Sequence, residues 1–176
     1  ITEGDRTQIG NPHPDFTMGL NLNFSYKGFD LNITGAGAFG QQIAKSYRSF
    51  ADSPLQNYTT DIFGRWTGEG TSNKLPRLTS GSHTNWQNIS DIYIEDGDYL
   101  KIQNLTIGYD FKKLFPTMPL GQARLYLTAQ NLFTFTGYSG MDPEIGYGYD
   151  KSWVSGIDLG YYPSPRTYMV GVNLKF

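Results

Sequence analysis

The sequence predicts an all-β fold: about five long antiparallel strands that form the C-terminal part of a transmembrane β-barrel, with two long extracellular loops. Apolar and polar residues alternate along segments of about 11 residues, the length a tilted strand needs to cross a bilayer. Charged residues make up only 17% of the 176 residues, aromatic residues make up 15%, and glycine occurs 21 times. The connections between the segments alternate between short and long.

The composition argues against several other classes of protein. The net charge of -2 is carried by scattered Lys and Arg residues, which argues against nucleic-acid binding. Because the chain has no cysteine, disulfides and thiolate metal sites are impossible. No run of about 18 apolar residues is present, so no transmembrane helix is predicted, whereas barrel strands need apolar residues only at every second position. Residues 1–15 lack an apolar signal core, so the chain is expected to be mature, truncated or internal.

The first two predicted strands form a hairpin. From Phe16 to Tyr26 every even position is apolar and every odd position is small or polar. Lys27-Gly28 then reads as a two-residue turn, which places Tyr26 and Phe29 on the same face of the sheet. The alternation continues in that register to Phe39. The small residues at 35–38 predict a bend or a close approach by another part of the protein.

A long polar connection, 41–98, precedes the third strand. Part of it, at 41–50, could form a short helix. The third strand is expected at 99–111, and the phase of its apolar residues slips near Asn104. The slip predicts either a β-bulge or an upper half that projects beyond the lipid.

Two further strands, at 122–136 and 166–176, follow a short turn at 112–121 and a second long loop at 137–165. Alternation in the final strand, closed by an aromatic residue, is typical of the assembly signal of outer-membrane barrels, carried here by Tyr168, Val170, Val172, Leu174 and Phe176. An aromatic girdle is expected where strands meet the interface, formed by Tyr26, Phe29, Phe111 and Phe176.

Loop lengths predict the orientation in the membrane. With the last residue in the periplasm, both long connections fall outside the cell and both short ones inside, as in known barrels. This arrangement places residues 1–14 outside. Five strands cannot close a barrel, so they must pair with other strands. The chain would be a fragment of a longer chain cut or split in an extracellular loop, or one subunit of an oligomeric barrel.

Several segments resemble the SusC/RagA-type TonB-dependent transporters of Bacteroidetes. They occur in the family's order over nearly the whole chain, and the weaker matches are Arg65–Thr67 and Ile9–Pro12. The main ones are Ile94–Asp110, Ala129–Thr136, Tyr138–Gly140, Asp142–Glu144, Gly156–Asp158, Tyr162–Pro163 and Pro165–Tyr168.

The resemblance implies a 22-stranded outer-membrane barrel with a plug, active import of oligosaccharides or peptides, and energy from the TonB complex. The implied partners are the remaining barrel strands and plug, a SusD-like surface lipoprotein, outer-membrane lipid and the cargo. Neither the plug nor the TonB-contacting segment lies within these residues. The alternative left open by the residues is a soluble extracellular carbohydrate-binding β-sandwich, which would bury its apolar faces against a second sheet.

Candidate site residues are few. Glu95, Asp96 and Asp98 form a weak candidate for Ca²⁺, although a solvated loop rim is the favoured interpretation. The two histidines are far apart in the sequence, so a zinc site has no support. The sequence also has no phosphate-binding loop and no nucleophile elbow, so neither another cofactor nor catalysis has support. Aromatic residues of the second loop either contact cargo or a partner, or pack within the loop: Tyr138, Tyr147, Tyr149, Trp153 and Tyr161.

Overall fold

The computed structural model describes residues 3–47, 60–72, 74–78, 90–145 and 155–176. The chain divides into two compact units. The sheet unit comprises residues 15–39, 98–137 and 163–176, and the loop unit comprises 1–14, 40–97 and 138–162. Within the described ranges, no helix has the length and apolarity that a membrane-crossing helix needs.

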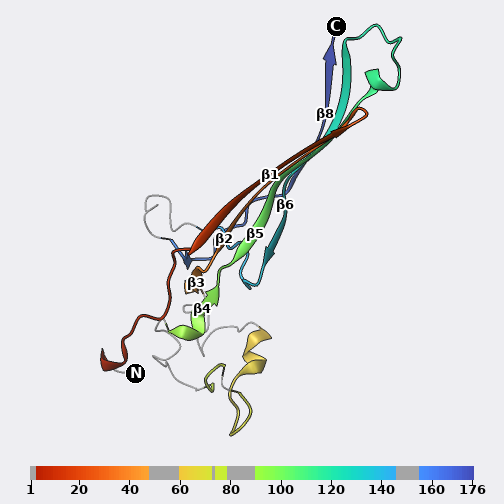
Figure 1. Cartoon of the computed structure of the whole chain (residues 1–176). Helices are drawn as coiled ribbons and strands as arrows, with labels where there is room; N and C mark the ends of the chain where they lie inside the picture. Colours follow the sequence, from red (N-terminus) through yellow and green to blue (C-terminus); the bar gives the residue numbers. More distant parts are fainter. Residues whose placement is uncertain (1–2, 48–59, 73, 79–89, 146–154) are drawn as a thin grey trace. The chain divides into compact units, whose positions relative to one another are not determined.

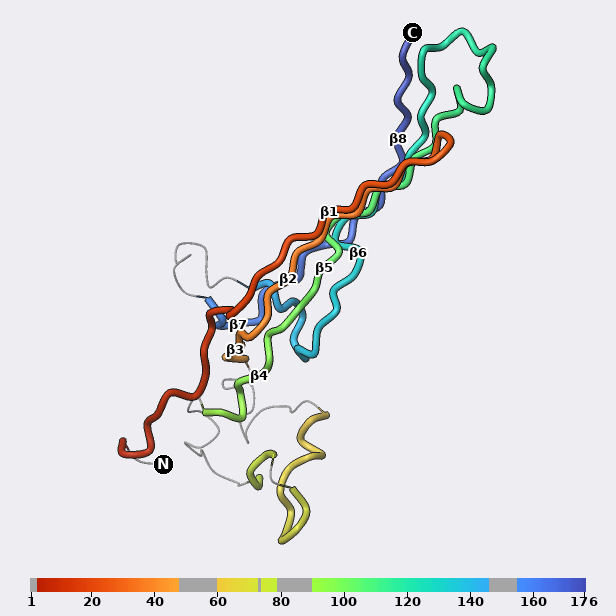
Figure 2. Tube along the Cα trace, viewed as in Figure 1, coloured from red at the N-terminus to blue at the C-terminus, as the bar shows by residue number. Residues whose placement is uncertain are grey.

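The sheet unit is one five-stranded antiparallel sheet. Its order is β1-β2-β5-β6-β8, so strands that follow one another within the unit are also neighbours in space (Figures 1 and 2). All five strands predicted from the sequence are confirmed to within two residues at either end. They are β1 (Phe16–Tyr26), β2 (Phe29–Phe39), β5 (Tyr99–Asp110), β6 (Gln122–Thr136) and β8 (Thr167–Lys175).

The predicted two-residue turn between β1 and β2 is confirmed. Lys27 has φ 47° and Gly28 has φ 94°, and Tyr26 pairs with Phe29. Positive φ at both central residues is typical of a type I′ turn, whose backbone twist matches the twist of the two strands that it joins. The turn sets the register of the whole hairpin, which runs unbroken to the pair Phe16 and Phe39.

The phase slip near Asn104 coincides with a β-bulge, the first of the two alternatives that the sequence left open. The register between β5 and β6 shifts between Ile102 and Asn104, and on the other side of β5 it shifts between Thr34 and Gly35 of β2. Because of the extra residue, Leu100 and Ile102 lie on the same face of the sheet as Leu105 and Ile107. The predicted close approach also occurs, because a Cβ on Gly35 would lie 2.8 Å from the Lys101 carbonyl oxygen.

The sheet has one apolar face and one polar face. A row of directly paired residues on the apolar face crosses all five strands, and it reads Phe24, Leu31, Ile107, Leu127 and Val170. These side chains are not sealed inside the protein, since Phe24 is 61% exposed and Val170 is 73% exposed. The apolar faces therefore lack the burial that the β-sandwich alternative requires.

The loop unit contains a small sheet of its own, which the sequence did not predict. Its order is β4-β3-β7, with β3 antiparallel to β4 and parallel to β7. The prediction of a short helix at 41–50 is wrong for Gln42–Lys45, which form strand β3. Residues 46–47 are helical, and 48–50 lie outside the described residues. The strands are β3 (Gln42–Lys45), β4 (Ile94–Asp96) and β7 (Ile157–Asp158), and the short 3-10 helices are η1 (Glu3–Asp5), η2 (Thr60–Gly64), η3 (Asp91–Tyr93) and, in the sheet unit, η4 (Phe111–Lys113).

Candidate functional site

The polar face of the sheet carries hydrogen-bonded side chains. One row of paired residues reads Asn23, Asn32, Thr106, Thr128 and Met169. The Asn32 side-chain amide donates to Asn23 Oδ1 at 2.6 Å, and the Thr106 and Thr128 hydroxyls lie 2.9 Å apart. Cross-strand pairs of this kind stabilise the sheet. Because their side chains are polar, this face of the sheet can also hydrogen-bond to water. Such a face suits a water-filled lumen.

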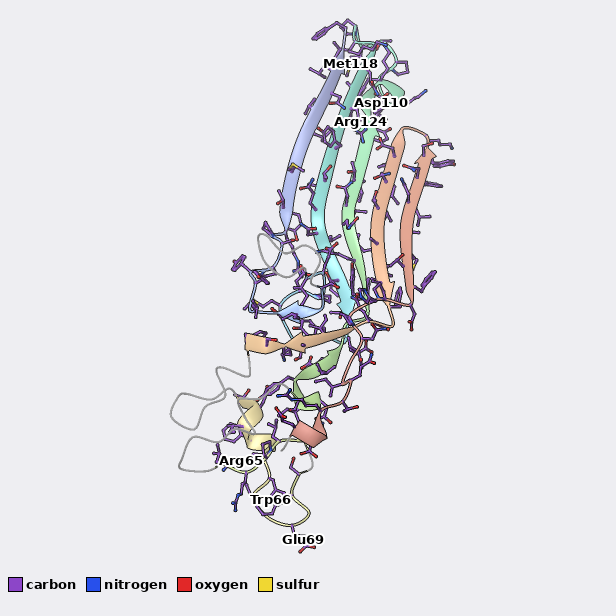
Figure 3. All side chains as sticks on the ribbon, turned by 90° about the vertical axis from the view of Figure 1, so that its left-hand side faces the viewer. Arg65, Trp66, Glu69, Asp110, Met118 and Arg124 are labelled. Atoms are coloured by element: carbon purple, nitrogen blue, oxygen red, sulfur yellow. The ribbon has the colours of Figure 1, made fainter. Side chains whose placement is uncertain are left out.

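An ion pair spans three strands on the same face. Arg124 of β6 donates through Nε to Asp30 Oδ1 of β2 at 2.7 Å, and through Nη2 to the second carboxylate oxygen. Between them lies Gly108 of β5, where an added Cβ would stand 2.6 Å from Arg124 and from Asp30. The guanidinium also lies 4.8 Å from the Tyr126 ring centroid. In the strand register Arg124 pairs with Asp110, and Figure 3 shows both at the end of the sheet where β5 ends and β6 begins.

In the loop unit, Glu95 joins the two long loops. Its Oε1 accepts hydrogen bonds from Lys45 Nζ at 2.9 Å and from the Ser139 hydroxyl at 2.8 Å, and its Oε2 accepts from the Ser139 backbone N–H at 2.9 Å. Lys45 Nζ also donates to the Ser139 hydroxyl oxygen. Lys45 and Glu95 come from the first long loop and Ser139 comes from the second. Three side chains therefore connect segments that are far apart in sequence.

The Lys45 ammonium is nearly sealed from solvent. Its side chain is 7% exposed, whereas that of Glu95 is 30% exposed. Burial acts to raise the pKa of Glu95, but the hydrogen bonds from Lys45 and Ser139 outweigh it and hold the pKa below the ordinary value. The carboxylate therefore stays ionised and compensates a buried cation.

Tyr138 and Asp158 form a second buried contact in the loop unit. The Tyr138 hydroxyl donates to Asp158 Oδ2 at 2.6 Å, and the Gly160 N–H donates to Oδ1 at 2.7 Å. Tyr138 is 6% exposed and Asp158 is 2% exposed. Burial, followed by the hydrogen bond to Asp158, raises the pKa of Tyr138 far above its ordinary value. The contact fixes the start of the second long loop to the segment around β7.

A cavity of about 740 Å³ lies beside the Glu95 contacts. Its size is within the range of small-ligand sites. It combines two lysines, two carboxylates and apolar side chains, so it can offer both hydrogen bonds and apolar contact to a ligand. The lining includes Lys45, Asp61, Lys74, Leu75, Tyr93 and Glu95.

The predicted acidic residues have other partners. Glu95 binds Lys45 and Ser139, and Asp96 and Asp98 also take part in interactions within the structure. Asp98 belongs to the sheet unit, whereas Glu95 and Asp96 belong to the loop unit. Among the described residues, no group of three or more acidic or histidine side chains has the geometry to hold a metal ion.

The predicted contact residues of the second loop are only partly described. Tyr147, Tyr149 and Trp153 lie outside the described residues. Tyr138 is buried and hydrogen-bonded to Asp158, which is the packing role left open by the sequence. Tyr161 is 38% exposed, and its contact role stays a prediction.

The predicted assembly-signal residues lie on the apolar face of β8 or directly after it. Tyr168, Val170, Val172 and Leu174 are each at least half exposed, and Phe176 is 93% exposed. Their alternation is confirmed by the pairing of Val170 with Leu127 and of Val172 with Leu125. Their role in assembly stays a prediction.

The weakly matching Arg65–Thr67 segment starts a folded tip in the loop unit. The Trp66 N–H donates to the Leu75 carbonyl oxygen at 2.9 Å, and the Thr71 hydroxyl closes the turn on the Gly68 carbonyl oxygen at 2.7 Å. Arg65, Trp66 and Glu69 lie along this tip (Figure 3). Trp66 is 40% exposed, which leaves its ring open to a ligand or a partner.

No family model matches the chain. Relatives do match it, and the similarity extends over the whole length of the chain. It is 37% identical over its full length to TonB-dependent receptor P3 of Formosa agariphila and 29% identical over its full length to TonB-dependent receptor SusC of Bacteroides thetaiotaomicron. The chain spans only 18% and 16% of those two proteins.

Solved structures agree. The structure of the RagAB peptide transporter covers 93% of the chain with a TM-score of 0.72 and 27% identity, and the chain covers 17% of that protein. The RagAB peptide importer in the "closed-closed" state gives a TM-score of 0.70 over the same share of both chains.

These comparisons explain the open sheet. The five strands match part of a transporter barrel, and the sheet does not close because the chain supplies only a fraction of the strands. The names of these relatives and solved structures agree with the resemblance found in the sequence. Over its whole length the chain is similar to one segment of SusC/RagA-like TonB-dependent receptors, and its sheet matches part of their barrel.

Proposed function

We propose that this chain forms part of the wall of an outer-membrane, TonB-dependent importer. The observation that carries the proposal is the continuous apolar row across β1, β2, β5, β6 and β8, which remains exposed in the chain itself. Side chains of this kind need hydrocarbon around them, and both free sheet edges need partner strands. The polar face, with the Asn and Thr rows and the Arg124–Asp30 pair, would line the lumen.

The loop unit would lie on the extracellular side and meet cargo or a lid. Support comes from the cavity beside Glu95, the exposed Trp66 ring and the names of the relatives, one of which is a peptide transporter. We propose an oligosaccharide or a peptide as cargo and a SusD-like lipoprotein as the partner. The remaining strands, the plug and the TonB contact would come from the rest of the transporter, and no catalytic step is proposed.

A test uses the full-length transporter that contains this segment. A folded outer-membrane barrel keeps a compact, fast-migrating form on unboiled gels, and boiling converts it to a slower form. We expect this heat-dependent shift and a need for detergent in solution. A monodisperse, detergent-free protein would refute the membrane assignment. Uptake of labelled cargo by cells with and without the gene then tests import itself.

A further inference from the structure

The end of the sheet that carries the β1–β2 turn and η4 gathers aromatic rings on the apolar face. The Phe29 and Tyr109 ring centroids are 4.4 Å apart, and those of Tyr109 and Phe111 are 5.2 Å apart. Tyr26 is 58% exposed and Phe29 is 56% exposed. The rings therefore form a packed cluster with open outer surfaces.

Two lysines adjoin this cluster. Lys27 Nζ lies 5.2 Å from the Tyr26 ring centroid, so its ammonium is held beside an apolar-face ring. The stem of Lys113 packs on the same turn, since a Cβ on Gly28 would stand 3.0 Å from Lys113 Cβ. Both lysines are exposed. Two cations therefore stand at the end of an apolar surface.

The neighbouring charged groups are already engaged. Asp30 pairs with Arg124 on the polar face. Asp110 accepts hydrogen bonds from the backbone N–H groups of Lys112 at 3.0 Å and Ala123 at 3.2 Å. The Lys112 ammonium donates to the Met118 carbonyl oxygen at 2.6 Å. Among the cations at this end, Lys27 lies beside the aromatic rings and Lys113 packs on the adjoining turn.

We propose that Lys27, Lys113 and the rings of Tyr26, Phe29, Tyr109 and Phe111 form a binding site for an anionic glycerophospholipid of the periplasmic leaflet. The lysines take the headgroup phosphate, and the rings pack against the glycerol region and the first acyl carbons. The positive charges of Lys27 and Lys113 favour an anionic lipid over a zwitterionic one, because each lysine near the membrane surface attracts anionic lipid independently. This site rests on the proposed membrane location, which makes this end of the sheet periplasmic.

The test uses the full-length transporter in nanodiscs of phosphatidylethanolamine with a minor fraction of phosphatidylglycerol. Native mass spectrometry then measures the phosphatidylglycerol that stays bound. The variants Lys27→Gln and Lys113→Gln should each reduce this retention roughly fivefold, and the double variant by about 20-fold. Lys175→Gln is the matched control, because Lys175 lies at the same end of the sheet but alternates with the apolar-face residue Leu174. It should retain the lipid as the unmodified protein does.

The outcomes separate the two proposals. Heat-dependent migration first establishes that each variant is folded. Insertion into nanodiscs with equal retention by the unmodified and double-variant proteins would overturn the lipid site and leave the membrane location standing. Equal retention of phosphatidylethanolamine and phosphatidylglycerol would reduce the cluster to an unselective aromatic girdle, which also overturns the site. Failure to insert would remove both proposals.

Discussion

Arg124 and Asp30 meet across an intervening strand although they are 94 positions apart in the sequence. The guanidinium makes two hydrogen bonds to the carboxylate, and both side chains lie on the polar face of the sheet. The pair therefore links β2 to β6 over β5. In a barrel segment without a packed core of its own, such a link contributes stability that the exposed apolar face cannot supply in water.

Opening this pair should weaken the sheet. Asp30→Asn or Arg124→Gln leaves one charge without its partner, and each should cost about 1 kcal/mol in the folded transporter. Arg124→Lys should recover only part of the loss, because an ammonium cannot form two parallel hydrogen bonds to one carboxylate. The temperature at which the compact gel form disappears measures the effect. An additive double variant would show that the two residues do not interact.

Gly108 should be intolerant of a side chain for the same reason. In Gly108→Ala the new Cβ would stand 2.6 Å from Arg124 and from Asp30, so the ion pair must move or open. Gly19 is the control, since it also lies on the polar face and has no atom within 4 Å of an added Cβ. We expect Gly108→Ala to lower the unfolding temperature and Gly19→Ala to leave it unchanged. Equal effects would mean that strand propensity, and not the pair, decides the cost.

The two faces of β8 should respond oppositely to a charge. Val170 is an apolar-face residue that is 73% exposed, and its neighbour Met169 on the polar face is 41% exposed. Val170→Arg should disfavour membrane insertion by about 2–4 kcal/mol near the bilayer centre. Met169→Arg should be tolerated, because that side chain would face the lumen. Refolding yields in liposomes, read from unboiled gels, compare the two. The reverse ranking would mean that the faces are assigned the wrong way round.

The sheet could be predicted from the sequence because its pattern is local. Strict alternation identified β1 and β2, and Lys27-Gly28 fixed their register through a turn of two residues. The bulge in β5 was visible as a change of phase near Asn104. Each of these signals depends on neighbours in the sequence, and the bilayer enforces the same period on every strand.

The contacts between distant segments could not be predicted. Nothing in the sequence near Lys45 indicates that it pairs with Glu95, and the favoured interpretation of the acidic run at 95–98 was a solvated loop rim, with Ca²⁺ binding as the weak alternative. The three-stranded sheet β4-β3-β7 has short strands with no clear period, so Gln42–Lys45 resembled the start of a helix. Arg124 and Asp30 could each be assigned to the polar face, but only the strand order brings them together.

Glu95→Gln should loosen the connection between the two long loops. The amide keeps an acceptor for Ser139 but leaves the buried Lys45 ammonium without a counter-charge, at a cost of roughly 1–3 kcal/mol within the loop unit. Hydrogen exchange of the segment around Ser139 should become faster. Glu69→Gln is the control, because Glu69 is an exposed residue at the tip of the same unit (Figure 3). Equal exchange in both variants would contradict a linking role for Glu95.

Acid should reproduce the effect of Glu95→Gln. Burial opposes ionisation of Glu95, but hydrogen bonds from Lys45 and Ser139 lower its pKa below the ordinary value of 4.5. A carboxylate with a lowered pKa contributes stability that is fully present above the ordinary value and is lost as the pH falls through the folded-state pKa. The exchange rate around Ser139, corrected for the intrinsic pH dependence, should therefore stay slow at neutral pH and rise only when the pH falls below the ordinary Glu value of 4.5. In the Glu95→Gln variant it should already be fast at neutral pH and change little on acidification. A parallel acid response in both proteins would assign the pH dependence to other carboxylates.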